Sequence, residues 1–311
     1  MQLPEKRMKA LRQLIREKPL VRVLEAHNGL SAKIVENTSI ETEKGKQCFD
    51  AIWESSLTDS ASKGKPDIEL IDFTSRVQTI NQILEVTTKP IIVDGDTGGL
   101  EETFVYVVRT LERLGVSAII IEDKTFPKRN SLMIDTKHKQ EDIDVFCDKI
   151  YVGKHSQLSK DFMIIARVES LIANAGLDDA INRAQAYIEA GADAIMIHSK
   201  SNSPKEVLTF CNIYNTFSTK VPLVSVPTMY NSIREQELID NGFSIVIYAN
   251  QLLRSSYKQM LKTAQNILEH SRPKEAEQFC VPVQDIFDLT KQQRIIRRKN
   301  NEKEKCNTVN D

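Results

Sequence analysis

The chain has 311 residues, enough to bury a sizeable core without covalent staples, so disulfide-framework and mini-protein folds are excluded. Hydrophobic residues make up 41% of the chain and charged residues 27%, which is typical of a soluble globular domain and argues against disorder throughout. Lys and Arg number 42 against 43 Asp and Glu, so no net charge draws the molecule to nucleic acid or an anionic membrane, and a small-molecule partner is expected.

The cysteines and the N-terminal segment indicate the compartment. The cysteines are scattered and include no CxxC pair, which favours reduced thiols over disulfides or a zinc site: Cys48, Cys147, Cys211, Cys280 and Cys306. The N-terminal segment carries charges of both signs and no apolar core of a signal peptide. No stretch of the chain reaches about 18 uninterrupted apolar residues. We therefore expect a cytoplasmic protein that is neither exported nor membrane-spanning.

Short apolar runs rich in β-branched residues recur along the chain, and each ends in a polar residue, as in strands that are buried on both faces. In chain order the eight runs end near Glu25, Ser55, Asp94, Glu122, Arg167, His198, Thr228 and Asn250. They follow one another about every 32 residues, and a strand with its crossover helix needs roughly 30. Segments of helical period lie between them, and several end at a glycine: Gly115, Gly191 and Gly242. The sequence predicts an α/β fold, a (β/α)8 barrel.

An open, doubly wound sheet is the competing arrangement. Such a sheet usually carries a glycine-rich phosphate turn after its first strand, whereas here that turn reads EAHNGLSA and lacks GxGxxG. We therefore favour the barrel, with an N-terminal helix, as a single domain over residues 1–290. Residues 291–311 are polar with a basic centre and predict a solvated, disordered tail. Residues 38–48 are polar and predict a surface excursion between the first two strands.

The polar residues at the strand ends define the expected active site, because the βα loops of a barrel converge at the carboxyl ends of its strands. Asp94, Asp96 and Glu122 follow neighbouring strands and offer the hard oxygen ligands that suit Mg²⁺ or Mn²⁺. Taken alone, such acids are as often turn or cap residues, and their coincidence at adjacent strand ends favours a metal site. Arg167 and His198 end the next two strands and can bind a carboxylate or phosphoryl oxygen.

A polar segment of the length of a lid follows Glu122, from Asp123 to about Gln140. It carries three cations and an amide: Lys124, Lys128, Arg129 and Asn130. Lids that close over phosphates use such cations, although a bare charge run is usually only a solvated loop. Because the segment directly follows the acids at the strand ends, it predicts a lid that closes over a phosphate-binding site.

With these motifs the sequence resembles the phosphoenolpyruvate phosphomutase family, within the isocitrate lyase and phosphoenolpyruvate mutase superfamily. The resemblance runs from about Val21 to Leu289, in order through EAHNGLSA, IWESSLTDSASKGKPD, VDGDTGG, IEDKTFPKRNSL, IIARVESLI, AGADAIMIHSK, VPLVSVPT and VIYANQLLR. Its most specific piece is the lid motif EDKxxxKxNS, which residues 122–131 match.

The resemblance implies a role for each site residue. The metal, Mg²⁺ or in its place Mn²⁺, would be held by Asp94, with Asp96 and Glu122 acting largely through water. A pyruvate moiety would bind beside Trp53, near the backbone of Ser55, Ser56 and Leu57. The phosphoryl and enolate oxygens would be held by Lys128, Asn130, Arg167 and His198. Ser131 would contact the substrate, and Asp67 in SKGKPD matches the acid proposed as nucleophile or phosphoryl neighbour.

The implied reaction is the magnesium-dependent interconversion of phosphoenolpyruvate and phosphonopyruvate, an isomerisation in phosphonate biosynthesis. A phosphonopyruvate decarboxylase would consume the product. The resemblance also implies a homo-oligomer, a tetramer built as a dimer of dimers that exchange a C-terminal helix. Whether Asp67 forms a covalent phosphoaspartate or only positions the phosphoryl group stays open.

Three alternative functions were weighed. Phosphonopyruvate hydrolase shares the metal site but typically has Thr at the position of Asn130, so the amide favours the mutase, although TFPK in the lid also occurs in hydrolase-like sequences. The carbon-carbon lyases place a catalytic Cys in the lid, and the lid sequence here has none. A barrel that only binds a ligand would be expected to lack an acid or a cation of the site, and all are present.

Three positions depart from the pattern of the family. Gly95 stands where Ala is usual, Ser56 where Gly is frequent and Gln251 where His is common. We expect the changes at Gly95 and Ser56 to be tolerated because both exchange one small residue for another, although Ser56 could crowd a backbone amide near the substrate carboxylate. None of the three removes a charge from the predicted site.

Overall fold

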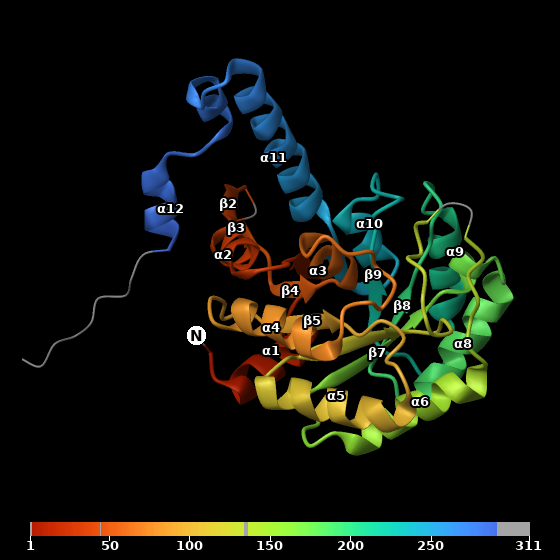
Figure 1. Ribbon diagram of the computed structural model, residues 1–311. Coiled ribbons are helices and arrows are strands. Elements are labelled where there is room, and N and C mark those ends of the chain that lie inside the picture. The colour runs from red at the N-terminus through yellow and green to blue at the C-terminus, as the bar shows by residue number, and fades with distance from the viewer. Residues whose placement is uncertain (1, 44, 134–135, 291–311) are drawn as a thin grey trace, which may run out of the picture. The chain divides into compact units, whose positions relative to one another are not determined.

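Eight parallel strands close into a barrel, which confirms the predicted (β/α)8 fold (Figure 1). The structure, a computed structural model, describes residues 2–43, 45–133 and 136–290. The barrel strands are β1 (Val21–Glu25), β4 (Ala51–Glu54), β5 (Ile91–Asp94), β6 (Ala118–Glu122), β7 (Met163–Val168), β8 (Ala194–Ile197), β9 (Leu223–Ser225) and β10 (Phe243–Tyr248). They lie around the barrel in chain order, and β10 closes it by pairing with β1.

The helices between successive barrel strands cover the outside of the barrel, and further helices precede β1 and follow β10 (Figure 1). The side chain of Asp72 accepts a hydrogen bond from the backbone of Ser75 and so caps one of them at its start, while Gly115 ends the next with a φ of 78°. The helices are α1 (Pro4–Glu17), α2 (Gly29–Asn37), α3 (Ser56–Ser62), α4 (Phe73–Leu84), α5 (Glu101–Leu114), α6 (Ile143–Ser156), α7 (Ser170–Ala173), α8 (Leu177–Glu189), α9 (Lys205–Tyr214), α10 (Glu235–Asp240), α11 (Gln251–His270), a 3₁₀ helix (Lys274–Phe279) and α12 (Val283–Leu289).

Side chains alternate along each strand between the barrel interior and the helical layer. In β6, Ala118 and Ile120 belong to the apolar cluster inside the barrel, whereas Ile119 and Ile121 belong to the cluster beneath the helices. The same two-residue period continues past the apolar residues, so Glu122 turns toward the interior at the carboxyl end. This alternation brings polar residues that end different strands to one mouth.

Helix α1 covers the opposite, amino-terminal end of the barrel. Its Leu11 is fully buried in the apolar cluster inside the barrel, and Leu14 and Ile15 pack against that cluster. The guanidinium of Arg7 donates to the backbone of Leu84 and Thr87, in the segment before β5. The predicted N-terminal helix is therefore present and forms the floor of the barrel.

Residues 38–48, predicted as a surface excursion, contain an antiparallel hairpin. Its strands are β2 (Ser39–Thr42) and β3 (Gly45–Cys48), paired from Ser39 opposite Cys48 to Thr42 opposite Gly45. The hairpin lies at the surface, as the polar sequence predicted, because its side chains are exposed or half-buried. Gly45 has a φ of 91°, a conformation that other residues rarely adopt.

The chain divides into two compact units, residues 1–257 and 258–311. The described part of the second unit holds the end of α11, the 3₁₀ helix and α12, and within it the ammonium of Lys262 lies 4.0 Å from the centre of the Phe279 ring. The single domain over residues 1–290 stays a prediction, and the predicted tail over 291–311 lies outside the described residues. Within the described ranges, no helix combines the length and the apolar character that a bilayer span needs.

Candidate active site

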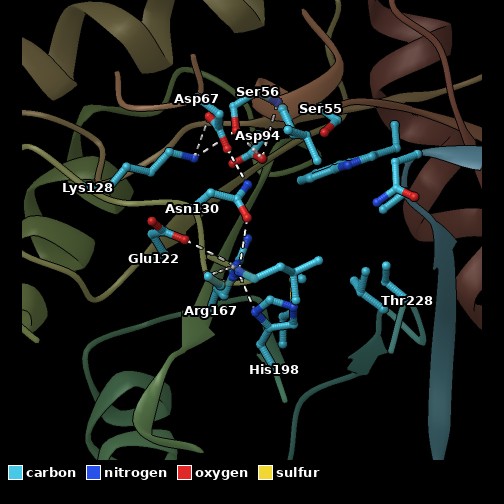
Figure 2. A pocket seen from close by; sticks show the side chains of 18 residues that line it. Ser55, Ser56, Asp67, Asp94, Glu122, Lys128, Asn130, Arg167, His198 and Thr228 are labelled. Carbon is cyan, nitrogen blue, oxygen red and sulfur yellow. Dashed lines mark hydrogen bonds and ion pairs between the residues drawn. The ribbon is translucent and has the colours of Figure 1, made fainter. Parts of the chain in front are cut away.

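A small cavity of about 50 Å³ lies at the carboxyl ends of the barrel strands (Figure 2). Every residue predicted for the site lines it except Asp96. The predicted residues in its lining are Trp53, Ser55, Ser56, Leu57, Asp67, Asp94, Glu122, Lys128, Asn130, Ser131, Arg167 and His198. Thr228 and Asn250, at the ends of the last two predicted strands, line it too. The structure thus brings together residues from positions 53 to 250 of the chain.

The carboxylates at the ends of β5 and β6 are buried and only partly hydrogen-bonded. Asp94 accepts hydrogen bonds from the Ser56 hydroxyl at 2.8 Å and from the Asp96 backbone at 3.2 Å. Both carboxylate oxygens of Glu122 are buried without a hydrogen bond; one lies 3.5 Å from the Lys124 ammonium and the other 3.3 Å from the Arg167 guanidinium, ion pairs too long to satisfy them fully. Unsatisfied oxygens of this kind are costly unless a cation approaches them. The donor set therefore fits a hard divalent cation such as Mg²⁺.

The acids are not arranged as a closed cage. Across the described ranges, no three Asp, Glu, His or Cys side chains are grouped so that they could ligate one ion together. Asp96 is engaged elsewhere, since its two oxygens lie 2.5 Å from the Lys128 ammonium and 2.9 Å from the Arg76 guanidinium. A cation here would contact few carboxylates directly and keep several water ligands, which is the usual habit of Mg²⁺.

The charge states of these acids are set by burial and by the surrounding cations. Burial raises the pKa of Glu122 to about 7, although Lys124 and Arg167 oppose the shift. Burial would also raise the pKa of Asp94, but Lys128, Arg167 and Arg76 outweigh it and hold that pKa below its usual value. Asp94 is consequently the acid of the pair that stays ionised over the widest pH range.

Lys128 is the lid cation that reaches furthest into the site. Its ammonium lies 2.8 Å from the Ser56 hydroxyl, 3.2 Å from Asp67 and 2.5 Å from Asp96. Burial disfavours the charged form, yet the surrounding carboxylates raise its pKa well above the ordinary value. The ammonium is thus held charged in the centre of an acidic cluster.

Asp67 is held by the lid through both oxygens. Besides the ion pair with Lys128, it accepts a hydrogen bond of 2.6 Å from the side-chain amide of Asn130 (Figure 2). The carbonyl oxygen of that amide accepts from the backbone of Leu132, which fixes which end of the amide faces Asp67. The carboxylate is therefore oriented from two sides.

Arg167 and His198 meet at Glu169, a residue that the sequence analysis did not identify as functional. Glu169 is fully buried and accepts from the Arg167 guanidinium at 2.5 Å, Ser131 at 2.6 Å and the Lys124 ammonium at 2.9 Å. Burial would favour its neutral form, but Arg167, Lys124 and His198 lower its pKa well below the usual range. Glu169 follows the end of β7 at Val168 and precedes α7, so the period of the strand gave no signal for it.

The imidazole of His198 is neutral in this environment. Burial and the neighbouring Arg167 lower its pKa to about 4. Its Nδ1 lies 2.7 Å from a Glu169 oxygen and 2.8 Å from the Arg167 guanidinium. Nδ1 thus faces both an acceptor, Glu169, and a donor, Arg167, and these two contacts call for opposite tautomers of the imidazole.

The two ends of the lid are joined at its base. Lys124 and Gln140 form an antiparallel bridge, and the side-chain amide of Gln140 donates to Asp123 at 3.1 Å. Asp123 also accepts from the Tyr187 hydroxyl at 2.8 Å and from Arg183 at 3.3 Å. The lid therefore grows from a fixed stem, while residues 134 and 135 lie outside the described ranges.

A second group missed by the sequence analysis lies behind the metal-site acids. Arg76 of α4 donates to the backbone carbonyl of Asp94 and pairs with Asp96. Near it, Glu54 is fully buried and neither of its carboxylate oxygens has a hydrogen bond. Burial raises the pKa of Glu54 to about 8. On β4, Glu54 points outward to the surrounding helices. The two-residue period of the strand predicts an apolar residue there, so that period alone could not reveal the role of Glu54.

The structure shows what surrounds Ser56 and Gly95, two of the positions that depart from the family pattern. The Ser56 hydroxyl donates to Asp94 and accepts from Lys128, so it links a metal-site acid to the lid. A Cβ on Gly95 would lie 2.6 Å from Cδ1 of Ile119. Ile119 therefore occupies the space that a side chain at position 95 would need.

Comparison with known proteins decides the family. The family model described as phosphoenolpyruvate phosphomutase matches residues 11–268. The chain belongs to this family. It is 36% identical to the phosphoenolpyruvate phosphomutase of Tetrahymena pyriformis over 280 residues, covering 90% of this chain and 89% of the relative.

Solved structures give the same result for the family and include two activities. The crystal structure of phosphoenolpyruvate phosphomutase from Streptomyces platensis subsp. rosaceus superimposes with a TM-score of 0.83 at 38% identity, covering 90% of this chain and 94% of that one. A crystal structure of phosphonopyruvate hydrolase in complex with oxalate and Mg²⁺ superimposes with a TM-score of 0.80 at 35% identity, covering 91% and 94%. The chain is an enzyme of this family, and similarity alone does not separate mutase from hydrolase.

Proposed function

We propose that the protein is a magnesium-dependent phosphoenolpyruvate phosphomutase, an isomerase that interconverts phosphoenolpyruvate and phosphonopyruvate. The observation that carries the proposal is the hydrogen bond of 2.6 Å from Asn130 to Asp67. The Lys128 ammonium lies 3.2 Å from the other oxygen, which has no hydrogen bond, so a lid side chain faces each oxygen of Asp67 and would compete with an attacking water for it. Transfer within the substrate is thereby favoured over hydrolysis.

The metal would be held by Asp94, with Asp96 and Glu122 acting through water, and Mn²⁺ could replace Mg²⁺. When bound, the cation would polarise the enolate oxygen and orient the pyruvate fragment. The unsatisfied oxygens of Glu122 support this assignment, as does the magnesium named with the related hydrolase structure. The pyruvate group would lie beside Trp53, against Ser55, Ser56 and Leu57, which line the cavity.

The phosphoryl group would be bound by the remaining polar residues of the cavity. Phosphoryl transfer passes through a loose transition state that needs charge stabilisation more than covalent help. Lys128 and Arg167 supply fixed positive charge, Asn130 supplies an amide donor, and Ser131 and His198 complete the wall. Asp67 is the acid placed to accept or adjoin the phosphoryl group. The lid would exclude water, which would otherwise hydrolyse the transferred group.

Phosphonopyruvate hydrolase is the second candidate function. It is favoured by a related hydrolase structure that is 35% identical to this chain, against 36% and 38% for the two mutases named above, and by the sequence TFPK in the lid. Both activities need the same acids and cations. They would differ in whether the lid leaves room for water beside Asp67, where Asn130 now lies.

The test is to incubate the purified protein with phosphonopyruvate and Mg²⁺ and to follow the products by phosphorus NMR, with an EDTA control. The mutase predicts phosphoenolpyruvate that forms only when the metal is present. Phosphate and pyruvate as the main products would replace the mutase with the hydrolase. No turnover by either route would contradict both activities.

We further propose a cytoplasmic homo-oligomer, a dimer of dimers with exchange of the C-terminal helix. Large apolar side chains stand exposed on α11 and α12, as expected of a surface that another subunit covers: Tyr257, Met260, Leu268 and Phe287. Light scattering on a sizing column would show a tetramer, and a monomer would contradict the proposal. Because phosphonopyruvate formation is unfavourable, a phosphonopyruvate decarboxylase is the partner expected to consume it.

A further inference from the structure

An outer cavity of about 790 Å³ adjoins the small inner cavity at the mouth of the barrel. The two share six lining residues: Leu57, Asp67, Asn130, Leu132, Thr228 and Asn250. Lining shared to this extent makes the outer cavity an antechamber of the inner one, and a ligand of the inner cavity can pass through it. We use the name antechamber for this outer cavity.

The antechamber carries two exposed arginines that the proposed chemistry does not use. Arg129 of the lid and Arg254 of α11 both line it, and within the described ranges neither guanidinium has an ion-pair partner. Arg254 donates to the side chain of Asn250 at 3.3 Å, which ties it to the edge of the inner cavity. The only acid in the lining is Asp67, whose oxygens are already engaged by Lys128 and Asn130. The antechamber is therefore positively charged overall.

The lid presents cations to both cavities. Lys128 is only 3% exposed and points among the inner acids, whereas its neighbour Arg129 is exposed and lines the antechamber. The backbone carbonyl of Arg129 accepts from the Lys124 ammonium at 3.0 Å. Because Lys124 is itself buried against Glu169, the backbone at Arg129 is held in place. Because the backbone here is fixed, the side chain of Arg129 is held on the outer side of the lid, where it lines the antechamber.

The inner cavity needs such an approach. Three carboxylates line it, from Asp67, Asp94 and Glu122, and its two lining cations, Lys128 and Arg167, are paired with acids, so the inner cavity carries no excess of positive charge to draw an anion in. Positive charge placed outside the mouth raises the local concentration of an anion and the rate at which it enters. If the antechamber were neutral, no positive charge would attract an anion on its way to the inner cavity.

We propose that the antechamber is a capture site for the anionic substrate, in which Arg129 and Arg254 bind its phosphonate or carboxylate group before it enters the inner cavity. The proposal rests on the proposed function for the identity of the substrate, a small phosphonate or phosphate that also carries a carboxylate. The two arginines act on entry and not on the chemical step.

Trp53 provides a readout that does not depend on turnover. It is the single tryptophan of the chain, it is 2% exposed and it lines the inner cavity. Stopped-flow fluorescence, in the presence of Mg²⁺, gives the association and dissociation rate constants of phosphonopyruvate and, separately, of oxalate. The variants are Arg129→Gln, Arg254→Gln and both together, with Arg113→Gln, an exposed arginine of α5, as the matched control.

The capture site predicts that the double variant associates about threefold to tenfold more slowly than the wild type with either anion at low ionic strength. The difference should fall below about twofold in ~0.5 M salt, because salt screens exposed charges. Dissociation and kcat should stay within about twofold, and Arg113→Gln should match the wild type throughout. Association rates that do not change, or that fall equally in Arg113→Gln, would overturn the capture site.

The two anions separate this proposal from the proposed function. If the wild type binds oxalate but not phosphonopyruvate, the proposed substrate is wrong, and the salt-dependent loss with oxalate still decides whether the antechamber captures anions. A loss in kcat or a faster dissociation without slower association would place the arginines in the closed site and overturn capture. Failure of both anions to bind the wild type would contradict both proposals.

Discussion

The side-chain amide of Asn130 lies 2.6 Å from a carboxylate oxygen of Asp67, a residue 63 positions earlier in the chain. The pair joins the lid to the loop after α3, so that the position of the lid and the orientation of the acid depend on each other. Threonine cannot reach as far and offers a hydroxyl in place of the amide. The nature of residue 130 therefore controls what can approach Asp67 from the lid side.

Replacing Asn130 by threonine should shift the products toward hydrolysis. The lost bond to a charged group corresponds to about 1.5–3 kcal/mol, so we expect phosphate relative to phosphoenolpyruvate to rise about tenfold or more. Phosphorus NMR on Asn130→Thr and on the control Asn81→Thr, an exposed site on α4, measures the ratio. An unchanged ratio in Asn130→Thr would show that this bond does not exclude water.

Glu169→Gln should impair both stability and catalysis. The carboxylate compensates the buried cations Arg167 and Lys124, and removing one partner of such a group costs about 3–5 kcal/mol. It also orients His198, so kcat should fall by about tenfold or more while the affinity for Mg²⁺ stays close to that of the wild type. Thermal unfolding, steady-state kinetics and calorimetric metal titration separate the effects. A variant with normal kcat would show that Glu169 only stabilises the fold.

Glu54 should make stability depend on pH. Its pKa is about 8 in the folded protein against 4.5 as the reference value, so the folded state holds a proton that the unfolded state releases. Stability is therefore lost as the pH rises from about 5 to 8, by on the order of 4 kcal/mol, and levels off above. Glu54→Gln removes the titration, so its stability relative to the wild type should increase over this range.

Denaturant unfolding at several pH values measures that change. Glu102→Gln, an exposed position on α5, serves as the control and should show no such trend. A difference between Glu54→Gln and the wild type that is constant from pH 5 to 8 would mean that Glu54 is ionised in the folded protein.

Gly95→Ala should destabilise the barrel, although the sequence analysis expected glycine and alanine to be interchangeable here. The new Cβ would lie 2.6 Å from Cδ1 of Ile119 and 3.0 Å from the backbone oxygen of Ile120. Overpacking of this kind costs about 1–3 kcal/mol. Adding Ile119→Val, which removes Cδ1, should restore part of the loss, whereas Gly29→Ala meets nothing nearer than 3.4 Å and should be nearly neutral. Unfolding midpoints that do not differ between Gly95→Ala and the wild type would refute the clash.

The fold and most of the site could be predicted from the sequence because strand period and barrel topology are coupled. The apolar runs of β5, β6 and β7 each end in a polar residue of the inward parity, so Asp94, Glu122 and Arg167 had to meet at one mouth. Thr228 lines the cavity even though β9 ends three residues earlier, at Ser225. The prediction of the site therefore depended on which residues of a strand face inward, and less on the exact residue at which each strand ends.

The residues that support the site could not be predicted in the same way. Glu169 follows Arg167 after the apolar run has ended, and only its partners from the lid and from β8 reveal that it joins them. Glu54 faces outward from β4 and Arg76 faces inward from α4, and their neighbours come from different βα units. Such contacts depend on tertiary distances that a single sequence does not encode.

The floor formed by α1 has a consequence for molecular traffic. Because Leu11 fills the amino end of the barrel from below, the mouth under the lid is the passage through which a ligand of the inner cavity enters and leaves. In the proposed reaction, two fragments formed there would be confined together beneath the lid. Confinement would favour their recombination over their separation, as for a reactive pair held in a solvent cage. Helix α1, at the far end of the barrel, would thus contribute to the outcome of the chemistry at the mouth.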